Sequence, residues 1–265
     1  MLTRRRLLTL GAAGLGVLVA GDAVKKAASE SRPLARGRAV IPPANTSPSL
    51  RPRPIPPPAL PPLPRRAEAI HTLHDLYPNA PANAIALTID DGPSLEWTPK
   101  ILDLLAEHDV KATFSLIGIQ VKQFPKLAER IVASGHLLCN HTMHHPLDIA
   151  SLSSKKVDAE ITEAHDRIAG ATGVAPKFFR SPGGAWSRAV FDSAARHGML
   201  PIDWDIDPRD WSRPGTDHIK HVMLTAKGGE ILLCHDGGGD RSETIKALSQ
   251  VIPKLKQHGL TFVSL

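Results

Sequence analysis

The 265-residue sequence is poor in cysteine, and most of its length has no excess of positive charge. Residues 1–70 contain 12 Lys and Arg against 3 Asp and Glu, whereas residues 71–265 contain 20 against 23, a formal charge of −3. A nucleic-acid-binding domain needs a basic face on the fold itself, so we expect no nucleic-acid partner. The near-neutral balance of residues 71–265 fits an uncharged or mixed substrate better than a strongly acidic one.

The sequence has two cysteines, Cys139 and Cys234, and neither lies near the N-terminus, which excludes a lipoprotein anchor. Successive side chains of a strand point to opposite faces. Cys139 should therefore share a side with His141, whereas Cys234 and His235 should point in opposite directions. This arrangement makes a disulfide awkward. We expect two buried thiols, with a disulfide as the alternative.

The first 23 residues have the pattern of an export signal. Three arginines, Arg4–Arg6, precede an apolar run at residues 10–20, which is short for a membrane span. An arginine pair before a core rich in Gly and Ala resembles a twin-arginine signal. A general secretory signal and an uncleaved anchor are the alternatives. All three predict an exported protein, secreted or associated with the cell envelope, that contacts a membrane only through this segment.

Residues 24–69 are predicted to form a disordered linker. Eleven prolines occur in the 23 residues from Pro42 to Pro64, with arginines among them. Such a segment cannot bury enough apolar surface to fold, and it stays extended. It would act as a spacer that carries the next domain away from a membrane or through a cell wall. We expect that domain at residues 70–265, which is long enough for one sizeable core.

Strand and helix signals alternate from residue 85 onward. The expected strands are residues 85–90, 112–118, 136–140, 177–180, 200–204, 230–235 and 260–265. The expected helices are residues 97–108, 124–134, 157–171, 188–197, 218–226 and 243–257. This alternation predicts an α/β domain with a mainly parallel sheet. With about seven strands, we expect a distorted (β/α) barrel whose chemistry lies at the carboxyl ends of the strands.

The unusual polar clusters of the chain fall at these strand ends. Asp90 and Asp91 end the first strand, where Gly92-Pro93 cannot continue it. Two adjacent carboxylates are costly unless a metal or a base role uses them; a polar turn is the alternative. His141 and His145 follow the third strand, and one helical turn would place both on one face. Two imidazoles and one carboxylate, with room for water, are the ligand set of a hydrolytic zinc site.

Five motifs, in this order, resemble those of the polysaccharide deacetylase family, the NodB-homology domain of carbohydrate esterase family 4. The motifs are Thr88-Ile-Asp-Asp-Gly-Pro93, His141-Thr-x-x-His-Pro146, Arg180-x-Pro182, Asp207-x-x-Asp-Trp211 and Leu233-x-His235. The resemblance covers residues from about 84 to 265. It implies a polysaccharide N-deacetylase, a hydrolase that removes N-acetyl groups from a polymer containing N-acetylglucosamine.

The resemblance also implies a metal site and an acid–base pair. By it, Asp91, His141 and His145 bind a divalent metal. Zn²⁺ is the expected ion, and Co²⁺, Ni²⁺ and Mn²⁺ are alternatives. Asp90 would be the general base that accepts a proton as a metal-activated water attacks the acetyl group. His235 would be the general acid that protonates the departing amine.

Further residues receive supporting roles from the same resemblance. Asp210 would pair with His235, and Arg180 would hold a carboxylate, that of Asp90, in its ionised form. His144, an extra histidine inside the second motif, is expected to be solvated or to support the site rather than to bind the metal.

The pocket around the acetyl group is expected to be partly apolar. Trp211 and Leu233 would form its wall for the methyl group, and Thr142 would steady the histidine loop. Gly183 stands where members of the family commonly have an aromatic residue. Its backbone N–H can still serve an oxyanion, but the aromatic side of the groove is lost unless Trp186 replaces it.

Three functions compete at this point. Export and a wall-spanning linker favour N-deacetylation of peptidoglycan over chitin oligosaccharide. An O-deacetylase acting on acetylated xylan is the second reading; an ester has the better leaving group and depends less on His235. A catalytically silent carbohydrate-binding module of the envelope is the third, and the complete set of ligands, base and acid argues against it. We expect a monomer.

Overall fold

The computed structural model describes residues 60–265 of the chain. The expected export signal and most of the expected linker lie outside these residues. Within residues 60–265, no helix is both long enough and apolar enough to cross a membrane.

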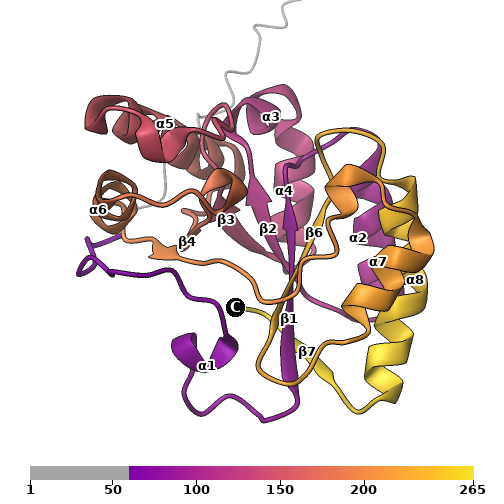
Figure 1. Ribbon diagram of the computed structural model, residues 1–265. Helices are drawn as coiled ribbons and strands as arrows, with labels where there is room; N and C mark the ends of the chain where they lie inside the picture. Colours follow the sequence, from indigo (N-terminus) through magenta and orange to yellow (C-terminus); the bar gives the residue numbers. More distant parts are fainter. Residues whose placement is uncertain (1–59) are drawn as a thin grey trace, which may run out of the picture. The chain divides into compact units, whose positions relative to one another are not determined.

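Seven parallel strands form one curved sheet (Figure 1). They are β1 (Ala84–Asp90), β2 (Thr113–Leu116), β3 (Leu137–Asn140), β4 (Phe178–Phe179), β5 (Leu200–Pro201), β6 (Ile231–His235) and β7 (Thr261–Val263). The order is β5-β4-β3-β2-β1-β6, and β7 also pairs with β1. Beyond β5, Ile206 forms a parallel bridge with Leu232 of β6, which brings the two edges of the sheet together. The prediction of a distorted (β/α) barrel is confirmed.

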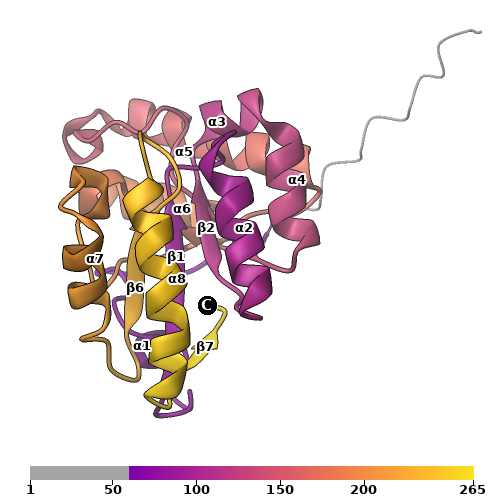
Figure 2. The same ribbon diagram turned by 90° about the vertical axis from the view of Figure 1, so that its right-hand side faces the viewer.

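Helices flank the sheet, and all of them lie on its outer side except the first, whose Leu73 packs with the cluster inside the curve. They are α1 (Leu73–Leu76), α2 (Trp97–Glu107), α3 (Gly118–Gln123), α4 (Pro125–Ala133), α5 (Ser154–Thr172), α6 (Arg188–Arg196), α7 (Thr216–Met223) and α8 (Ser242–Gln257). Three short 3-10 segments accompany them, η1 (Ile149–Ser151), η2 (Pro182–Gly184) and η3 (Asp210–Ser212). Figure 2 shows α2, α8 and α7 side by side in front of β1 and β6. The short helices α1 and α3 were not predicted.

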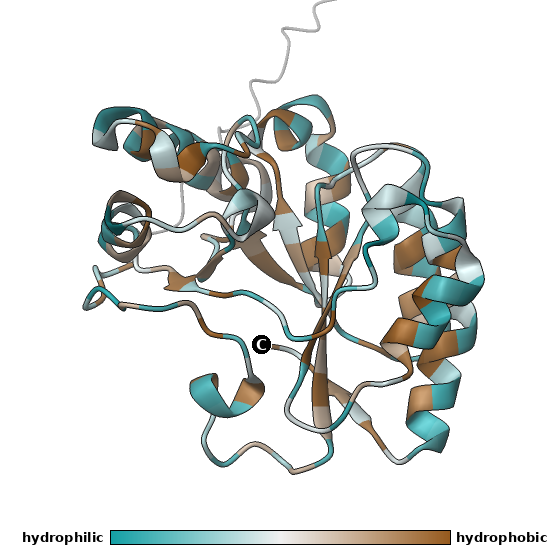
Figure 3. Ribbon diagram, in the orientation of Figure 1, coloured by the Kyte–Doolittle hydropathy of each residue, from teal (hydrophilic) through white to brown (hydrophobic). Residues whose placement is uncertain are grey.

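The core lies between the sheet and this layer of helices. Ile85, Leu87 and Ile89 of β1 pack in one cluster with Ile101 and Leu105 of α2. In Figure 3 the apolar colour concentrates in the strands and on the helix sides that face them, whereas the outer helix sides are hydrophilic. Helical spacing therefore decides which side of each helix is buried, as the sequence pattern predicts.

Strand alternation aims the polar residues at the inside of the curved sheet. Because Ile89 faces the helices, its neighbour Asp90 points to the other side. In β6, Cys234 faces the helices, and His235 points inward. Asp90 and His235 are also direct partners in the register of β1 and β6. The sheet thus brings two residues that are far apart in sequence together at the carboxyl ends of two neighbouring strands.

Both cysteines are buried free thiols, as expected. Cys139 packs with Phe178 inside the curved sheet, whereas Cys234 belongs to the cluster under the helices. Burial raises the pKa of the Cys139 thiol to about 12. The thiols are structural groups of the core.

The chain contacts the domain before the boundary expected at Ile70. The backbone N–H of Leu63 donates to the carbonyl of Ala195 in α6, at 2.9 Å. Arg65 pairs with Asp192 of the same helix, with 3.1 Å between nitrogen and oxygen. The last residues of the expected linker therefore run along α6.

Candidate active site

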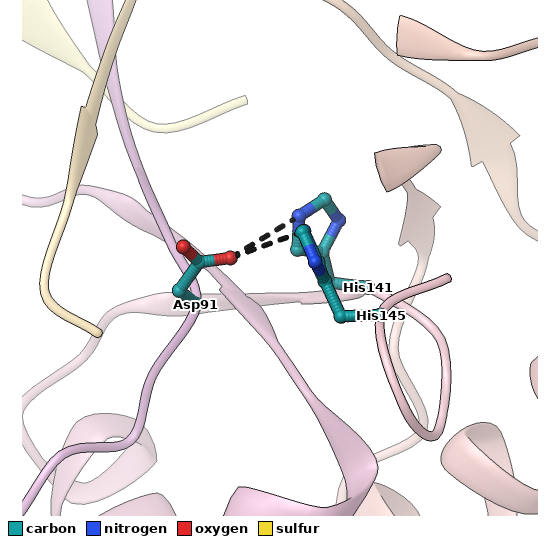
Figure 4. Close-up of side chains that lie close together, drawn as sticks. All are labelled: Asp91, His141 and His145. Atoms are coloured by element: carbon teal, nitrogen blue, oxygen red, sulfur yellow. Dashed lines mark ion pairs between the residues drawn. The ribbon is translucent and has the colours of Figure 1, made fainter. Parts of the chain in front are cut away.

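Asp91, His141 and His145 come together at the carboxyl ends of β1 and β3, with the carboxylate facing both rings (Figure 4). One ligand atom from each residue lies within 4.8 Å of the others. The Nε2 atoms of His145 and His141 are 3.3 Å and 3.6 Å from Asp91 Oδ1. That oxygen is buried and has no hydrogen-bond partner among the described residues. An orphaned carboxylate oxygen opposite two imidazole nitrogens fits a divalent cation.

The protonation of the two histidines also fits a metal site. His141 Nδ1 lies 2.8 Å from the carbonyl oxygen of Arg180. Because a carbonyl only accepts, Nδ1 must carry the proton, and the lone pair of Nε2 is left facing Asp91. Burial, and then the neighbouring His141, lower the pKa of His145. A neutral imidazole is the form that binds a metal.

A loop, not a helical turn, brings the two histidines together. Thr142 and His145 have φ angles of 66° and 60°, in the left-handed region. The Thr142 hydroxyl accepts a hydrogen bond from His145 N at 3.0 Å, and Asn140 Oδ1 accepts one from Thr142 N at 2.9 Å. Left-handed backbone is costly for a β-branched residue such as Thr, and these side-chain bonds offset that cost. The helical arrangement suggested by the four-residue spacing is therefore wrong.

Asp90 is enclosed together with the guanidinium of Arg180. Arg180 Nη1 donates to Asp90 Oδ1 and to Thr88 Oγ1, both at 2.8 Å. Burial by itself raises the pKa of Asp90, but the charge of Arg180, with a smaller contribution from His235, outweighs it, so the pKa lies below its usual value. Asp90 is consequently ionised at neutral pH and able to accept a proton.

His235 and Asp210 form the second buried pair. His235 Nδ1 lies 2.7 Å from Asp210 Oδ1, and His235 N donates to Asp210 Oδ2 at 2.9 Å. Burial lowers the pKa of His235, but the hydrogen bond and charge of Asp210 raise it more, to about 9. The imidazole is therefore cationic at neutral pH, the form required of an acid.

A cavity of about 610 Å³ connects Asp91, His141 and His145 with Asp90 and His235. Trp211 and Leu233 line it, as predicted, and so do Trp204 and Leu147. Trp211 and Leu147 are also exposed, 46% and 68% respectively. The pocket thus has polar groups at its base and apolar side chains at its rim.

Gly183 also lines this cavity, but Trp186 does not. Trp186 stacks on Phe191, with 4.8 Å between ring centroids, and its Nε1 donates to Asp203 Oδ2 at 2.7 Å. It therefore does not replace the aromatic residue missing at Gly183. Trp204, which the sequence did not single out, supplies an aromatic wall instead.

The glycine loop after His235 packs against the Asp90–Asp91 turn. A Cβ at Gly237 would lie 2.1 Å from the carbonyl oxygen of Asp91, and one at Gly92 would lie 2.3 Å from Asp236 Oδ1. Glycine is needed at Gly237 because the two backbones approach so closely, and at Gly92 because the buried Asp236 carboxyl group fills the space. The loop therefore packs closely under the site, and its Gly238 also lines the cavity.

Asp236 is the main buried residue that the sequence did not reveal. Its carboxyl accepts a hydrogen bond from Thr98 of α2. Burial, and then the negative charges of Asp91 and Asp90, raise its pKa to about 7. Its position directly after His235 was the available signal, but its partner comes from another helix.

His144 does not belong to the cluster of Asp91, His141 and His145. Its Nδ1 lies 2.8 Å from Glu160 Oε1, and its side chain is 54% exposed. This agrees with the expectation that His144 is not a ligand.

The polysaccharide deacetylase family model matches residues 78–202. A peptidoglycan-N-acetylglucosamine deacetylase of Bacillus cereus is 41% identical over 183 residues, which cover 68% of this chain and 85% of the relative. A chitooligosaccharide deacetylase of Sinorhizobium fredii is 41% identical over 196 residues, 69% and 91% of the two chains. The chain belongs to the polysaccharide deacetylase family. The predicted family and the predicted class of enzyme are confirmed.

Solved structures of the family share the fold. A crystal structure of a peptidoglycan N-acetylglucosamine deacetylase has a TM-score of 0.67 at 36% identity, over 70% of this chain and 88% of that chain. A Bacillus anthracis protein described as a pseudoenzyme of carbohydrate esterase family 4 has a TM-score of 0.68 at 31% identity, over 76% and 68%. One neighbour is described as a pseudoenzyme. The side chains of the site are therefore the evidence on how this chain would catalyse a reaction.

Proposed function

We propose that this polysaccharide deacetylase is a metal-dependent hydrolase that removes N-acetyl groups from an N-acetylglucosamine-containing polysaccharide, with peptidoglycan as its substrate. One observation above all supports the proposal. An Asp–His–His cluster, the ionised Asp90 and the cationic His235 all face the same cavity. A binding module has no need of a carboxylate and an imidazolium held in opposite charge states at such a site.

Asp91, His141 and His145 would hold the divalent cation, for which Zn²⁺ is the expected ion. When bound, such an ion lowers the pKa of a water molecule and polarises a carbonyl group. The fit rests on the orphaned Asp91 Oδ1 and on the two Nε2 atoms that face it.

The chain's own residues would carry the protons. Asp90 Oδ1 is held by Arg180, so Oδ2 is the oxygen that accepts the proton of the attacking water. His235 Nδ1 is committed to Asp210, so Nε2 donates the proton to the departing amine. Neither group has to change its charge state before the reaction, because the pKa of Asp90 lies below its usual value and that of His235 is about 9.

The pocket would orient the acetyl group. The backbone N–H of Gly183 would donate to the oxyanion, and Trp211 and Leu233 would enclose the methyl group. Thr142 supports the loop that carries His145. These assignments favour an acetyl group over a larger acyl group.

Peptidoglycan is preferred to chitin oligosaccharide because of the expected export signal and proline-rich linker, which suit an enzyme of the cell envelope. Relatives of both names match this chain equally well, at 41% identity, so similarity alone does not choose between them. Export, secretion or envelope association, and a monomeric state, remain predictions.

The deciding experiment is acetate release by the full chain, with and without a chelator. Peptidoglycan, chitin oligosaccharide and acetylated xylan would be assayed in parallel. We expect chelator-sensitive release from peptidoglycan. Release from xylan alone would make the protein an O-deacetylase, and binding of glycan without any release would make it a carbohydrate-binding module.

A further inference from the structure

The start of α8 holds the segment that contains η3. Glu243 Oε2 accepts a hydrogen bond from Gly215 N at 2.9 Å. Arg241, directly before the helix, is buried, and its Nη1 donates to the carbonyl oxygen of Trp211 at 3.3 Å. Two side chains at the start of one helix thus fix a loop that belongs to the active site.

Thr244 of the same turn reaches the carboxylate of Asp210. Its hydroxyl donates to Asp210 Oδ2 at 2.8 Å, and both residues are 1% exposed. The remaining side-chain bonds of Asp210 all involve His235. No Lys or Arg forms a salt bridge with Asp210 within residues 60–265.

His235 and Thr244 hold the Asp210 carboxylate in different ways. His235 holds Asp210 through its backbone N–H and its ring, but these bonds come from the residue that has to be oriented. Thr244 supplies the bond that ties the carboxylate to a rigid helix. Without it, Asp210 Oδ2 keeps only the backbone N–H of His235 as a donor, and the carboxylate can tilt about that bond together with the imidazole ring. An acid that is misaligned by even a small rotation loses much of its effect on the rate.

We propose that Thr244 is a positioning residue for the acid: its hydroxyl fixes the plane of the Asp210 carboxylate, which fixes the direction of His235 Nε2. This inference rests on the proposed role of His235 as the general acid. Thr244 is not among the residues that line the cavity, and its one side-chain bond goes to Asp210, so we expect it to act on proton donation to the leaving group.

The test compares Thr244→Val and Thr244→Ser on two substrates. Valine keeps the shape of threonine and removes the hydroxyl, whereas serine keeps the hydroxyl. One substrate is an N-acetylated glycan oligomer, whose amine must be protonated as it leaves. The other is an aryl acetate ester, whose phenolate leaves without an acid.

For Thr244→Val we expect kcat on the amide to fall about tenfold with KM unchanged, and kcat on the ester to stay within about twofold of wild type. Thr244→Ser should restore the amide rate. Equal losses on both substrates, or no loss on the amide, would overturn the inference. If Thr244→Val fails to fold, Thr244→Ala gives the same comparison.

Two controls separate this inference from the proposed function. Thr113→Val makes the same chemical change at a buried hydroxyl that has no hydrogen-bond partner in the described part of the chain, and it should alter neither rate. His235→Ala should lower the amide rate far more than the ester rate. If His235→Ala shows no such selectivity, the acid assignment itself fails; if it does and Thr244→Val does not, only the role of Thr244 fails.

Discussion

Arg180 and Asp90 form an ion pair that is closed off from solvent. Arg180 Nη1 lies 2.8 Å from Asp90 Oδ1, and the two side chains are 0% and 3% exposed. They come from β1 and from the end of β4, three strands away across the sheet. Arg180 also donates to the carbonyl of Asp203 at 2.8 Å. Asp90, the proposed base, is therefore kept ionised by a cation that is itself held by Thr88 and Asp203.

Replacing Arg180 with methionine should destabilise the fold and change the pH dependence. The variant leaves a buried carboxylate without its cation, which costs about 3–5 kcal/mol of unfolding free energy. The pKa of Asp90 should rise, so the acidic limb of the pH–rate profile should move to higher pH. Urea denaturation and a pH–rate profile measure the two effects.

A surface pair provides the control for that prediction. Arg196 and Asp158 are 54% and 45% exposed, so Arg196→Met should cost less than about 1 kcal/mol of unfolding free energy.

The ion pair also makes stability depend on pH. Because the pKa of Asp90 is lowered in the folded state, the contribution of Asp90 to the unfolding free energy is present above the unfolded pKa and disappears as pH falls through the folded pKa. An acidic limb that stays in place in Arg180→Met would contradict the pairing.

The three proposed metal ligands should behave alike. Asp91→Ala, His141→Ala and His145→Ala should each abolish metal retention, because a hydrolytic site has only three protein ligands to lose. Asp90→Asn should keep the metal and lose turnover. Elemental analysis and acetate release distinguish the two classes of variant.

His144→Ala is the matched control, since His144 lies beside His145 but pairs with Glu160. It should keep both metal and activity. Full metal content in His141→Ala would show that the ligand set is wrong.

Much of the site was predictable because strand alternation is readable from sequence. Once Ile85, Leu87 and Ile89 are assigned to the buried helix-facing side, Asp90 must point inward. The parallel fold then places Asp90 and His235 at the same edge, which the register of β1 and β6 bears out.

The parts that were missed depend on partners from other elements. The left-handed backbone of Thr142 has no sequence signal, since a β-branched residue rarely adopts it, and His145 adopts a conformation that is still uncommon for histidine. Trp204 lines the pocket, whereas Trp186 is stacked on Phe191 outside it. Thr244 and Asp210 are 34 residues apart in the sequence, and no local sequence pattern predicts their contact.

Asp236 should make stability fall as pH rises. Its pKa is about 7 in the folded state, against an ordinary value of 3.8. The folded state therefore binds the proton more tightly, and unfolding free energy is lost as pH rises between these two values. The loss is up to about 4 kcal/mol at 1.36 kcal/mol per pKa unit. In Asp236→Asn this fall should be absent when unfolding is measured from pH 4 to pH 8.

Thr98→Val should act in the opposite direction. The Thr98 hydroxyl lowers the pKa of Asp236, so removing it should extend the fall in stability to higher pH. If Asp236→Asn and wild type have the same pH slope, Asp236 is ionised in the folded protein and this account of it is wrong.

The pair of His235 and Asp210 should set the alkaline limit of activity. His235 donates only while it is protonated, so kcat on an N-acetyl substrate should fall as pH rises through about 9. Asp210→Asn removes the charge that raises this pKa, and the alkaline limb should move to lower pH. A pH–rate profile of wild type and of Asp210→Asn on the same N-acetyl substrate measures the alkaline limb and its shift.

The same pair should contribute to stability in a defined pH window. Because the pKa of His235 is raised from 6.5 to about 9 on folding, its contribution is complete below pH 6.5 and is lost as pH rises towards 9. The contribution is about 3 kcal/mol at 1.36 kcal/mol per pKa unit. Asp210→Asn should remove this pH dependence, whereas Asp217→Asn, which alters an exposed pair with Lys220, should leave it intact. If the alkaline limb and the loss of stability move together in Asp210→Asn, one proton on His235 accounts for both; if only the limb moves, a different group controls stability in this range.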